Sequence, residues 1–72
     1  MPTPAPYRLY DPERRQPIET DFRLADEPTA RAAATRLVEA GEYNAVEIHH
    51  LEDGLFGYDY YRIGAIESEI DW

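Results

Sequence analysis

One segment of the sequence, DEPTARAAATRLVEAGE at residues 26–42, has the spacing of a helix and a boundary signal at each end. Asp26 or Glu27 can cap its amino end. Pro28 suits the first turn, where its missing N–H has no helical partner, and Gly41 follows the last apolar position. The segment therefore predicts one helix. Its apolar stripe is rich in alanine, which favours close packing on a sheet: Ala30, Ala33, Ala34, Leu37 and Val38.

The residues before this helix predict a β-hairpin. YRLYD at 7–11 is typical of a short strand, and DPER then places Pro12 in a type I turn that begins at Asp11. After the turn, IETDFRL at 18–24 alternates apolar and polar residues, the pattern of a half-buried strand.

The residues after the helix predict a second hairpin, with strands in YNAVEIHHL at 43–51 and LFGYDYYRIGAI at 55–66. A two-residue Asp53-Gly54 turn would pair Ile48 with a carboxylate. A type I turn with Gly54 as the bulge residue avoids that pairing, so we expect the bulged turn.

The bulged register divides the side chains of the second hairpin between two faces. The side toward the helix is expected to carry Val46, Ile48, His50, Phe56, Tyr58 and Tyr60. The opposite side is expected to carry Glu47, His49, Asp59 and Tyr61.

These elements predict an α+β fold in the order β-β-α-β-β. The sheet is antiparallel with four strands, or five if the tail AIESEIDW at 65–72 adds one, and the helix packs on one face. MPTPAP at 1–6 has three prolines and predicts a flexible arm. Residues 7–72 then form a single small domain.

Length and composition exclude several classes of protein. A chain of 72 residues buries only about 60% of its unfolded surface, so we expect no deep catalytic cleft. Without cysteine it has no disulfide, thiolate nucleophile or cysteine-bound zinc, which favours a cytoplasmic setting. The opening MPTPAPYR has proline where a secretory signal would need an apolar run, and no stretch approaches the ~20 consecutive apolar residues of a membrane span, so we expect a soluble, untargeted protein.

The charge balance bears on the partner. The chain has 15 acidic residues and 7 basic ones, for a net charge of −8. Such a surface repels DNA and RNA, because nucleic-acid binding depends on neutralising phosphates with Lys and Arg. A macromolecular partner is therefore expected to present a basic surface. The alternative is that the charge serves solubility alone.

Catalytic residues are scarce. Ser68 is the only serine, neither histidine is its neighbour in sequence, and no motif indicates an oxyanion hole. We expect no enzyme activity and no cofactor. The one alternative chemistry is a divalent metal held by Glu47, His49 and Asp59, since the bulged register places the two carboxylates opposite each other.

The tail allows two interpretations. In an extended strand, Glu67, Glu69 and Asp71 share one face, opposite a face that ends in Trp72. The acidic face could protect a sheet edge from aggregation, or it could extend an acidic row that imitates spaced phosphates. The candidate partner-binding residues are Glu47, Asp53, Asp59, Tyr61, Glu67, Glu69, Asp71 and Trp72.

In size and acidity, though in no motif, the whole chain resembles the small phage-encoded inhibitors of the anti-CRISPR and anti-restriction kind, some of which imitate DNA. That resemblance implies a non-enzymatic interaction module that binds a basic, nucleic-acid-handling protein. The alternatives are a small metal- or ligand-binding domain and a self-assembling adaptor subunit, such as a homodimer.

Overall fold

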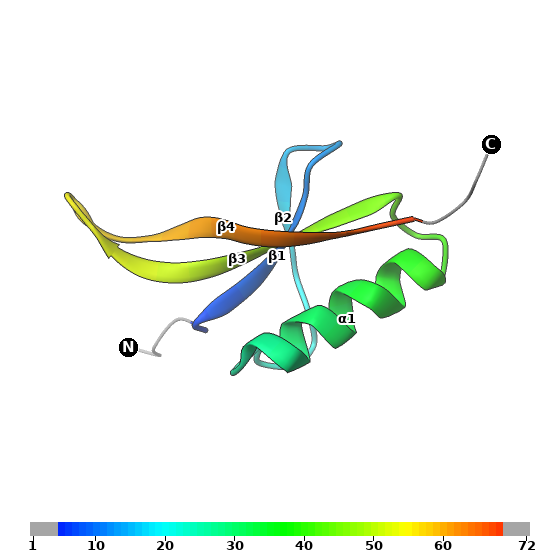
Figure 1. The fold of residues 1–72 in the computed structure, drawn as a ribbon, viewed down its shortest axis with the longest axis horizontal. Coiled ribbons are helices and arrows are strands. Elements are labelled where there is room, and N and C mark those ends of the chain that lie inside the picture. The colour runs from blue at the N-terminus through cyan, green and yellow to red at the C-terminus, as the bar shows by residue number, and fades with distance from the viewer. Residues whose placement is uncertain (1–4, 69–72) are drawn as a thin grey trace.

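The computed structural model describes residues 5–68, and Figure 1 shows its two layers, an antiparallel sheet and one helix on one face of it. Along the chain, the elements are β1 (Tyr7–Asp11), β2 (Gln16–Ile18), α1 (Glu27–Glu39), β3 (Ala45–Gly54) and β4 (Gly57–Glu67). The strands lie in the order β2-β1-β3-β4. The predicted α+β class and order of elements are confirmed.

The helix begins and ends where its local signals predict. Asp26 is the N-cap, and its Oδ1 accepts a hydrogen bond of 2.8 Å from the backbone N–H of Thr29. Hydrogen bonding to Thr29 also holds the pKa of Asp26 below its ordinary value. At the other end, Gly41 has a φ of 79°, a conformation that glycine adopts without steric cost, and its N–H donates to the carbonyl of Val38.

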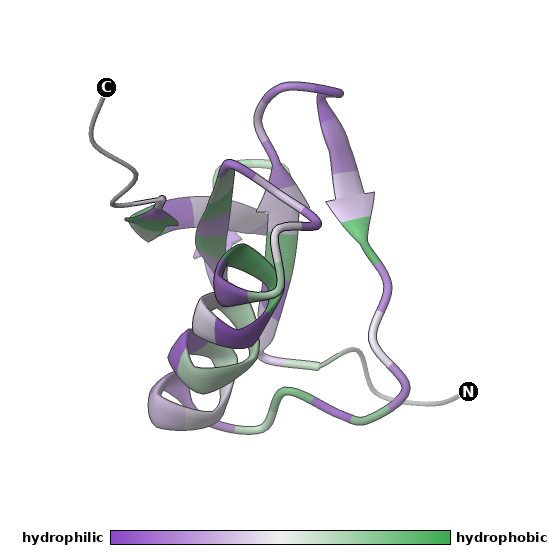
Figure 2. Ribbon diagram, turned by 90° about the vertical axis from the view of Figure 1, so that its right-hand side faces the viewer, coloured by the Kyte–Doolittle hydropathy of each residue, from purple (hydrophilic) through white to green (hydrophobic). Residues whose placement is uncertain are grey.

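The core lies between α1 and the sheet, and Figure 2 shows hydrophobic residues where the two layers meet. Its buried apolar residues are Leu9, Leu24, Ala30, Ala33, Ala34, Val46 and Ile48. The alanine stripe of α1 is therefore buried as predicted. Close approach of the helix is also visible at Gly64, where an added Cβ would lie 3.1 Å from a guanidinium nitrogen of Arg31.

The prediction of a strand at residues 18–24 is wrong except at Ile18, the only one of these residues that lies in a strand. β2 ends at Ile18, which pairs with Leu9, and the chain then runs irregularly to the helix. Leu24 still enters the core, whereas Phe22 is 50% exposed. An alternating pattern forms a strand only beside a partner, and here the chain must leave the edge of β1 to reach the start of α1.

The turn of the second hairpin lies three residues beyond the predicted position. Gly54 pairs with Gly57, and Leu55 and Phe56 form the turn between them. Gly57 has a φ of 114°, whereas Gly54, the expected bulge residue, does not have a positive φ. The predicted pairing of the hairpin is therefore wrong. A register shift in the ladder also occurs between Ile48 and His49.

Both ends of the described chain are tied to the sheet. The carbonyl of Ala5 accepts a hydrogen bond from the Tyr60 hydroxyl, and that of Pro6 accepts one from the N–H of Leu51. At the other end, residues 65–67 are the last part of β4 and not a separate strand, and the N–H of Ser68 donates to the carbonyl of Asn44. The remainder of the predicted fifth strand lies outside the described residues.

Candidate partner-binding site

The β3–β4 hairpin projects beyond the rest of the domain, as the left side of Figure 1 shows. β1 pairs with β3 only between Glu47 and His50. From Leu51 onward, the two strands of the hairpin pair with each other and lie beyond the end of α1. We call residues 51–61 the distal hairpin. It is an extended projection whose two faces are not covered by the helix.

The tip of the distal hairpin is apolar and exposed. Leu55 is 91% exposed and Phe56 is 99% exposed, with Tyr58 at 75% and Tyr61 at 48%. Phe56 and Tyr58 were expected to face the helix; that prediction is wrong, because the turn lies farther along the chain. Tyr61 is exposed, as expected, but it pairs with His50 and lies on the helix side of the sheet, whereas Tyr60 lies on the opposite side, so the expected faces of these two tyrosines are wrong. Exposed side chains of this size, gathered at one place, are typical of an interaction site.

Two glycines give the tip its shape. Gly57 has a positive φ, which a residue with a side chain rarely adopts, whereas at Gly54 the neighbouring atoms leave no room for a side chain. A Cβ added at Gly54 would lie 2.8 Å from the hydroxyl oxygen of Tyr61 and 3.1 Å from the carbonyl oxygen of Gly57. The Tyr61 side chain therefore lies along the hairpin, over the backbone of its tip.

The distal hairpin carries negative charge that no cation of residues 5–68 neutralises. Glu52 pairs directly with Asp59, and Asp53 pairs with Tyr58. All three carboxylates are exposed, and none forms a salt bridge with a described residue. The sequence contains no Lys or Arg between Arg36 and Arg62. Directly opposed like charges destabilise a strand pair, so a nearby cation would stabilise this one.

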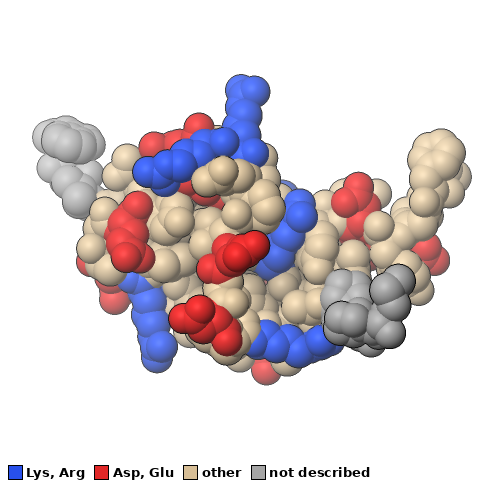
Figure 3. Space-filling model, turned by 180° about the vertical axis from the view of Figure 1, so that it is seen from behind, with Lys and Arg blue, Asp and Glu red and all other residues tan. Residues whose placement is uncertain are grey.

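Figure 3 shows the same separation of charge over one face of the molecule. Blue arginine atoms occur over the body of the domain, while the projecting end at the right shows acidic and uncharged atoms. The negative charge of the distal hairpin therefore lies beyond the arginines of the body on that face.

A second polar cluster lies on the sheet face opposite α1. We call it the open-face cluster, and it consists of Arg8, Tyr10, Glu47, His49, Tyr60 and Arg62. The rings of Tyr10 and His49 stack with their centroids 4.9 Å apart. The carboxylate of Glu47 contacts His49 Nε2 at 3.0 Å and Arg62 Nε at 3.6 Å. His49 is only 8% exposed, although no helix covers it.

The candidate partner-binding residues do not form one acidic row. Asp53, Asp59 and Tyr61 all lie on the distal hairpin, but Asp53 faces the opposite side of the ladder from Asp59 and Tyr61. Glu47 belongs to the open-face cluster, where Arg62 and His49 contact its carboxylate. Glu67 is eight residues from Asp59 along β4, about 25 Å at the usual rise per residue. Three others lie outside the described residues: Glu69, Asp71 and Trp72.

The sequence reasoning missed Glu52, Leu55, Phe56 and Tyr58 as members of the surface. Gly54 and Gly57 were the available signal, since they flank a two-residue turn. The turn was instead predicted at Glu52 and Asp53, because turns are ordinarily polar and Leu55 and Phe56 are apolar.

The alternative metal trio is not assembled. Glu47 and His49 lie together, but Glu47 pairs with Ala65, whereas Asp59 pairs with Glu52 on the distal hairpin. The expected pairing of Glu47 with Asp59 is wrong because the turn is displaced. Within residues 5–68, no group of three or more His, Cys, Asp or Glu side chains could hold a metal ion.

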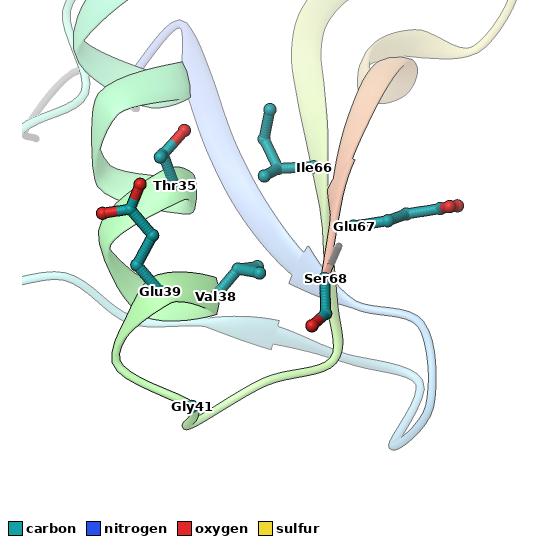
Figure 4. A pocket seen from close by; sticks show the side chains of 7 residues that line it. All are labelled: Thr35, Val38, Glu39, Gly41, Ile66, Glu67 and Ser68. Carbon is teal, nitrogen blue, oxygen red and sulfur yellow. The ribbon is translucent and has the colours of Figure 1, made fainter. Parts of the chain in front are cut away.

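A pocket of about 410 Å³ lies between the end of α1 and the end of β4 (Figure 4). Val38 and Ile66 point into the space between the helix and the strand, whereas Glu67 points to the other side of β4. Ser68 and Glu39 also line it, without a histidine among its described lining residues. Ser68 therefore has no imidazole base in this pocket.

No family model, curated protein or solved structure matches this chain. Among the described residues, no helix has the length and apolar character needed to cross a membrane.

Proposed function

We propose that the protein is a non-enzymatic interaction module that binds a basic surface of another protein through its distal hairpin. The observation that carries this proposal is the direct pairing of Glu52 with Asp59, next to a turn whose apolar residues are almost fully exposed. Both features are unfavourable in the isolated chain, and both are relieved by contact with a partner that is basic and partly apolar.

The two parts of the surface have different roles. Phe56 and Tyr58 supply the apolar contact, since large aromatic side chains carry much of the binding energy at protein interfaces. The carboxylates of Glu52, Asp53 and Asp59 supply complementary charge, which speeds association and selects for a basic partner. The projection of the hairpin allows it to enter a groove that the rest of the domain does not enter.

The partner class that we propose is a nucleic-acid-binding protein. The groove of such a protein carries arginine and lysine side chains placed for phosphates, and closely spaced carboxylates are suited to the same side chains. In this role the chain acts as an inhibitor of the phage-encoded type, without contacting nucleic acid itself.

Capture from a bacterial lysate with matched variants tests the proposal. The double variant Leu55→Ser with Phe56→Ser removes the apolar tip, and Phe22→Ser is its control, because Phe22 is another exposed apolar residue that lies beside α1 and not at the hairpin turn. We expect wild type and the control to capture the same basic protein and the double variant to lose it, with unchanged melting curves. Equal capture by all three would contradict the proposal, and so would recovery of the protein alone.

A further inference from the structure

The open-face cluster contains two buried polar atoms that have no partner. Arg8 Nε and His49 Nδ1 are the only buried side-chain nitrogen or oxygen atoms that lack a hydrogen bond within residues 5–68. Arg8 and His49 also pair directly across β1 and β3. Buried polar groups are nearly always hydrogen-bonded, so two unpaired atoms on neighbouring residues indicate a site that a ligand completes.

Among residues 5–68, Arg8 is a cation without an anionic partner. Its side chain forms no salt bridge and no hydrogen bond with the residues that the structure describes. Its guanidinium carbon lies 4.4 Å from the ring centre of Tyr60 and 5.9 Å from that of Tyr10. Tyr60 is itself fixed by its hydrogen bond of 2.6 Å to the carbonyl of Ala5. A guanidinium held against aromatic rings keeps donors for a carboxylate or a phosphate.

Arg62 extends the positive charge to the next strand. His49 pairs with Arg8 on one side and with Arg62 on the other, so the three residues form a row across β1, β3 and β4. Glu47 is the one carboxylate of the cluster, and it contacts His49 and Arg62 but not Arg8. The row therefore has an excess of positive charge in a protein whose net charge is −8.

The hydrogen bond to Glu47 determines what His49 can offer a ligand. A carboxylate oxygen accepts, so Nε2 of His49 carries the proton that it donates to Glu47. In the neutral ring, Nδ1 then has a lone pair, which repels an anion. In the imidazolium, Nδ1 also donates. The other groups around His49 are Arg8 and Tyr10 from β1 and Arg62 from β4.

We propose that the open-face cluster binds a small oxyanion, a carboxylate or a phosphate, through Arg8 and Arg62, beside His49. The anion accepts hydrogen bonds from the guanidinium of Arg8, which rotates away from the Tyr60 ring to meet it. Arg8, His49 and Arg62 lie outside the distal hairpin, which contributes only the ring of Tyr60 to the cluster, so each of the two proposals can fail without the other.

Titration of the wild-type protein, followed by the NMR signals of His49, Arg8 and Arg62, tests this inference. Inorganic phosphate and acetate are the probes, and chloride at the same ionic strength is the control. We expect saturable shifts of these signals with at least one probe. Saturation by phosphate alone, acetate alone or both identifies the class of anion. Saturation by neither overturns the proposal.

Three variants separate the cluster from general charge effects. Arg8→Gln should weaken binding at least about tenfold, as expected for loss of a charged hydrogen bond. Arg36→Gln, at an exposed position of α1, should leave the affinity unchanged. Arg62→Gln provides a second test if Arg8→Gln does not fold, and it should also weaken binding. Equal weakening by Arg36→Gln and Arg62→Gln would overturn the assignment to this face.

Discussion

Glu52 and Asp59 occupy directly opposed positions in the β3–β4 ladder, and no described cation contacts either carboxylate. Opposed side chains in an antiparallel pair lie about 5 Å apart at Cβ, so the two charges repel each other in the free protein. A protein selected only for stability would place an opposite charge or an uncharged residue at one of these positions. The proposed function explains the pair as the part of the surface that a basic partner neutralises.

Removal of one charge from this pair should stabilise the isolated protein. Asp59→Asn keeps an oxygen that can accept the hydrogen bond that Asp59 Oδ1 receives from the N–H of Tyr60. We expect the free energy of unfolding to rise by about 0.2–1 kcal/mol at low salt and the gain to shrink as salt is added. Urea denaturation checks the change, with Glu42→Gln, another exposed carboxylate, as the control. A loss of stability in Asp59→Asn would show that the two charges do not repel each other appreciably.

The backbone at the tip should make Gly57 much less tolerant of substitution than Gly64. Gly57 has a φ of 114° and open space around it, so Gly57→Ala introduces strain without a clash. We expect a cost of about 1–3 kcal/mol, measured by thermal or urea unfolding. At Gly64 an added Cβ meets only the end of the flexible Arg31 side chain, so Gly64→Ala should cost less. The reverse order would contradict the turn geometry described for residues 54–57.

Asp11 should contribute stability that is lost at acid pH. Burial of its carboxylate raises its pKa, but the side chain and N–H of Arg14, together with the N–H of Glu13, outweigh this and hold the pKa below its ordinary value. A group whose pKa is lowered by folding stabilises the protein above its unfolded pKa of about 3.9, and this stability is lost as the pH falls through the folded value. Asp11→Asn should therefore be less stable than wild type near neutral pH.

Urea denaturation of the two proteins at a series of pH values measures the effect of Asp11. The difference between wild type and Asp11→Asn should be constant above about pH 5 and shrink below about pH 4. Comparison at each pH cancels the contribution of the other carboxylates. A difference that does not change with pH would indicate that the Asp11 carboxylate gains no stabilising interaction from Arg14.

The helix was predictable because its signals are local. Asp26 at the N-cap, Pro28 in the first turn and Gly41 past the end each act within a few residues, and the alanine stripe repeats within the same segment. The first strand and its turn were also predictable, because Asp11 forms the expected hydrogen bonds to the N–H groups of Glu13 and Arg14.

The second hairpin was predictable in existence but not in register. Both EDG at 52–54 and LFG at 55–57 place glycine after two residues, and polarity favoured the first. In the structure the turn forms at LFG. This adds three residues to β3, and Asp59 lies opposite Glu52 and not opposite Glu47. A choice between two turns depends on the whole ladder, which no short segment specifies.

The open-face cluster was not predictable because it depends on strand order. Arg8 and His49 are far apart in sequence and meet only because β1 lies beside β3. The orientation of His49 away from the helix was predicted from alternation along the strand. Its low exposure was not, since that comes from the neighbouring side chains of β1 and β4.

We propose that the distal hairpin binds a basic partner, and capture with two charge-matched triple variants separates this binding from a general charge effect. One variant combines Glu52→Gln, Asp53→Asn and Asp59→Asn, and the other makes three such changes at exposed carboxylates elsewhere: Glu13→Gln, Glu19→Gln and Glu42→Gln. Both lose the same charge, so general electrostatics are equal. We predict that the first variant loses a salt-sensitive basic partner that wild type and the second variant retain. Equal retention or equal loss by the two variants would contradict the claim.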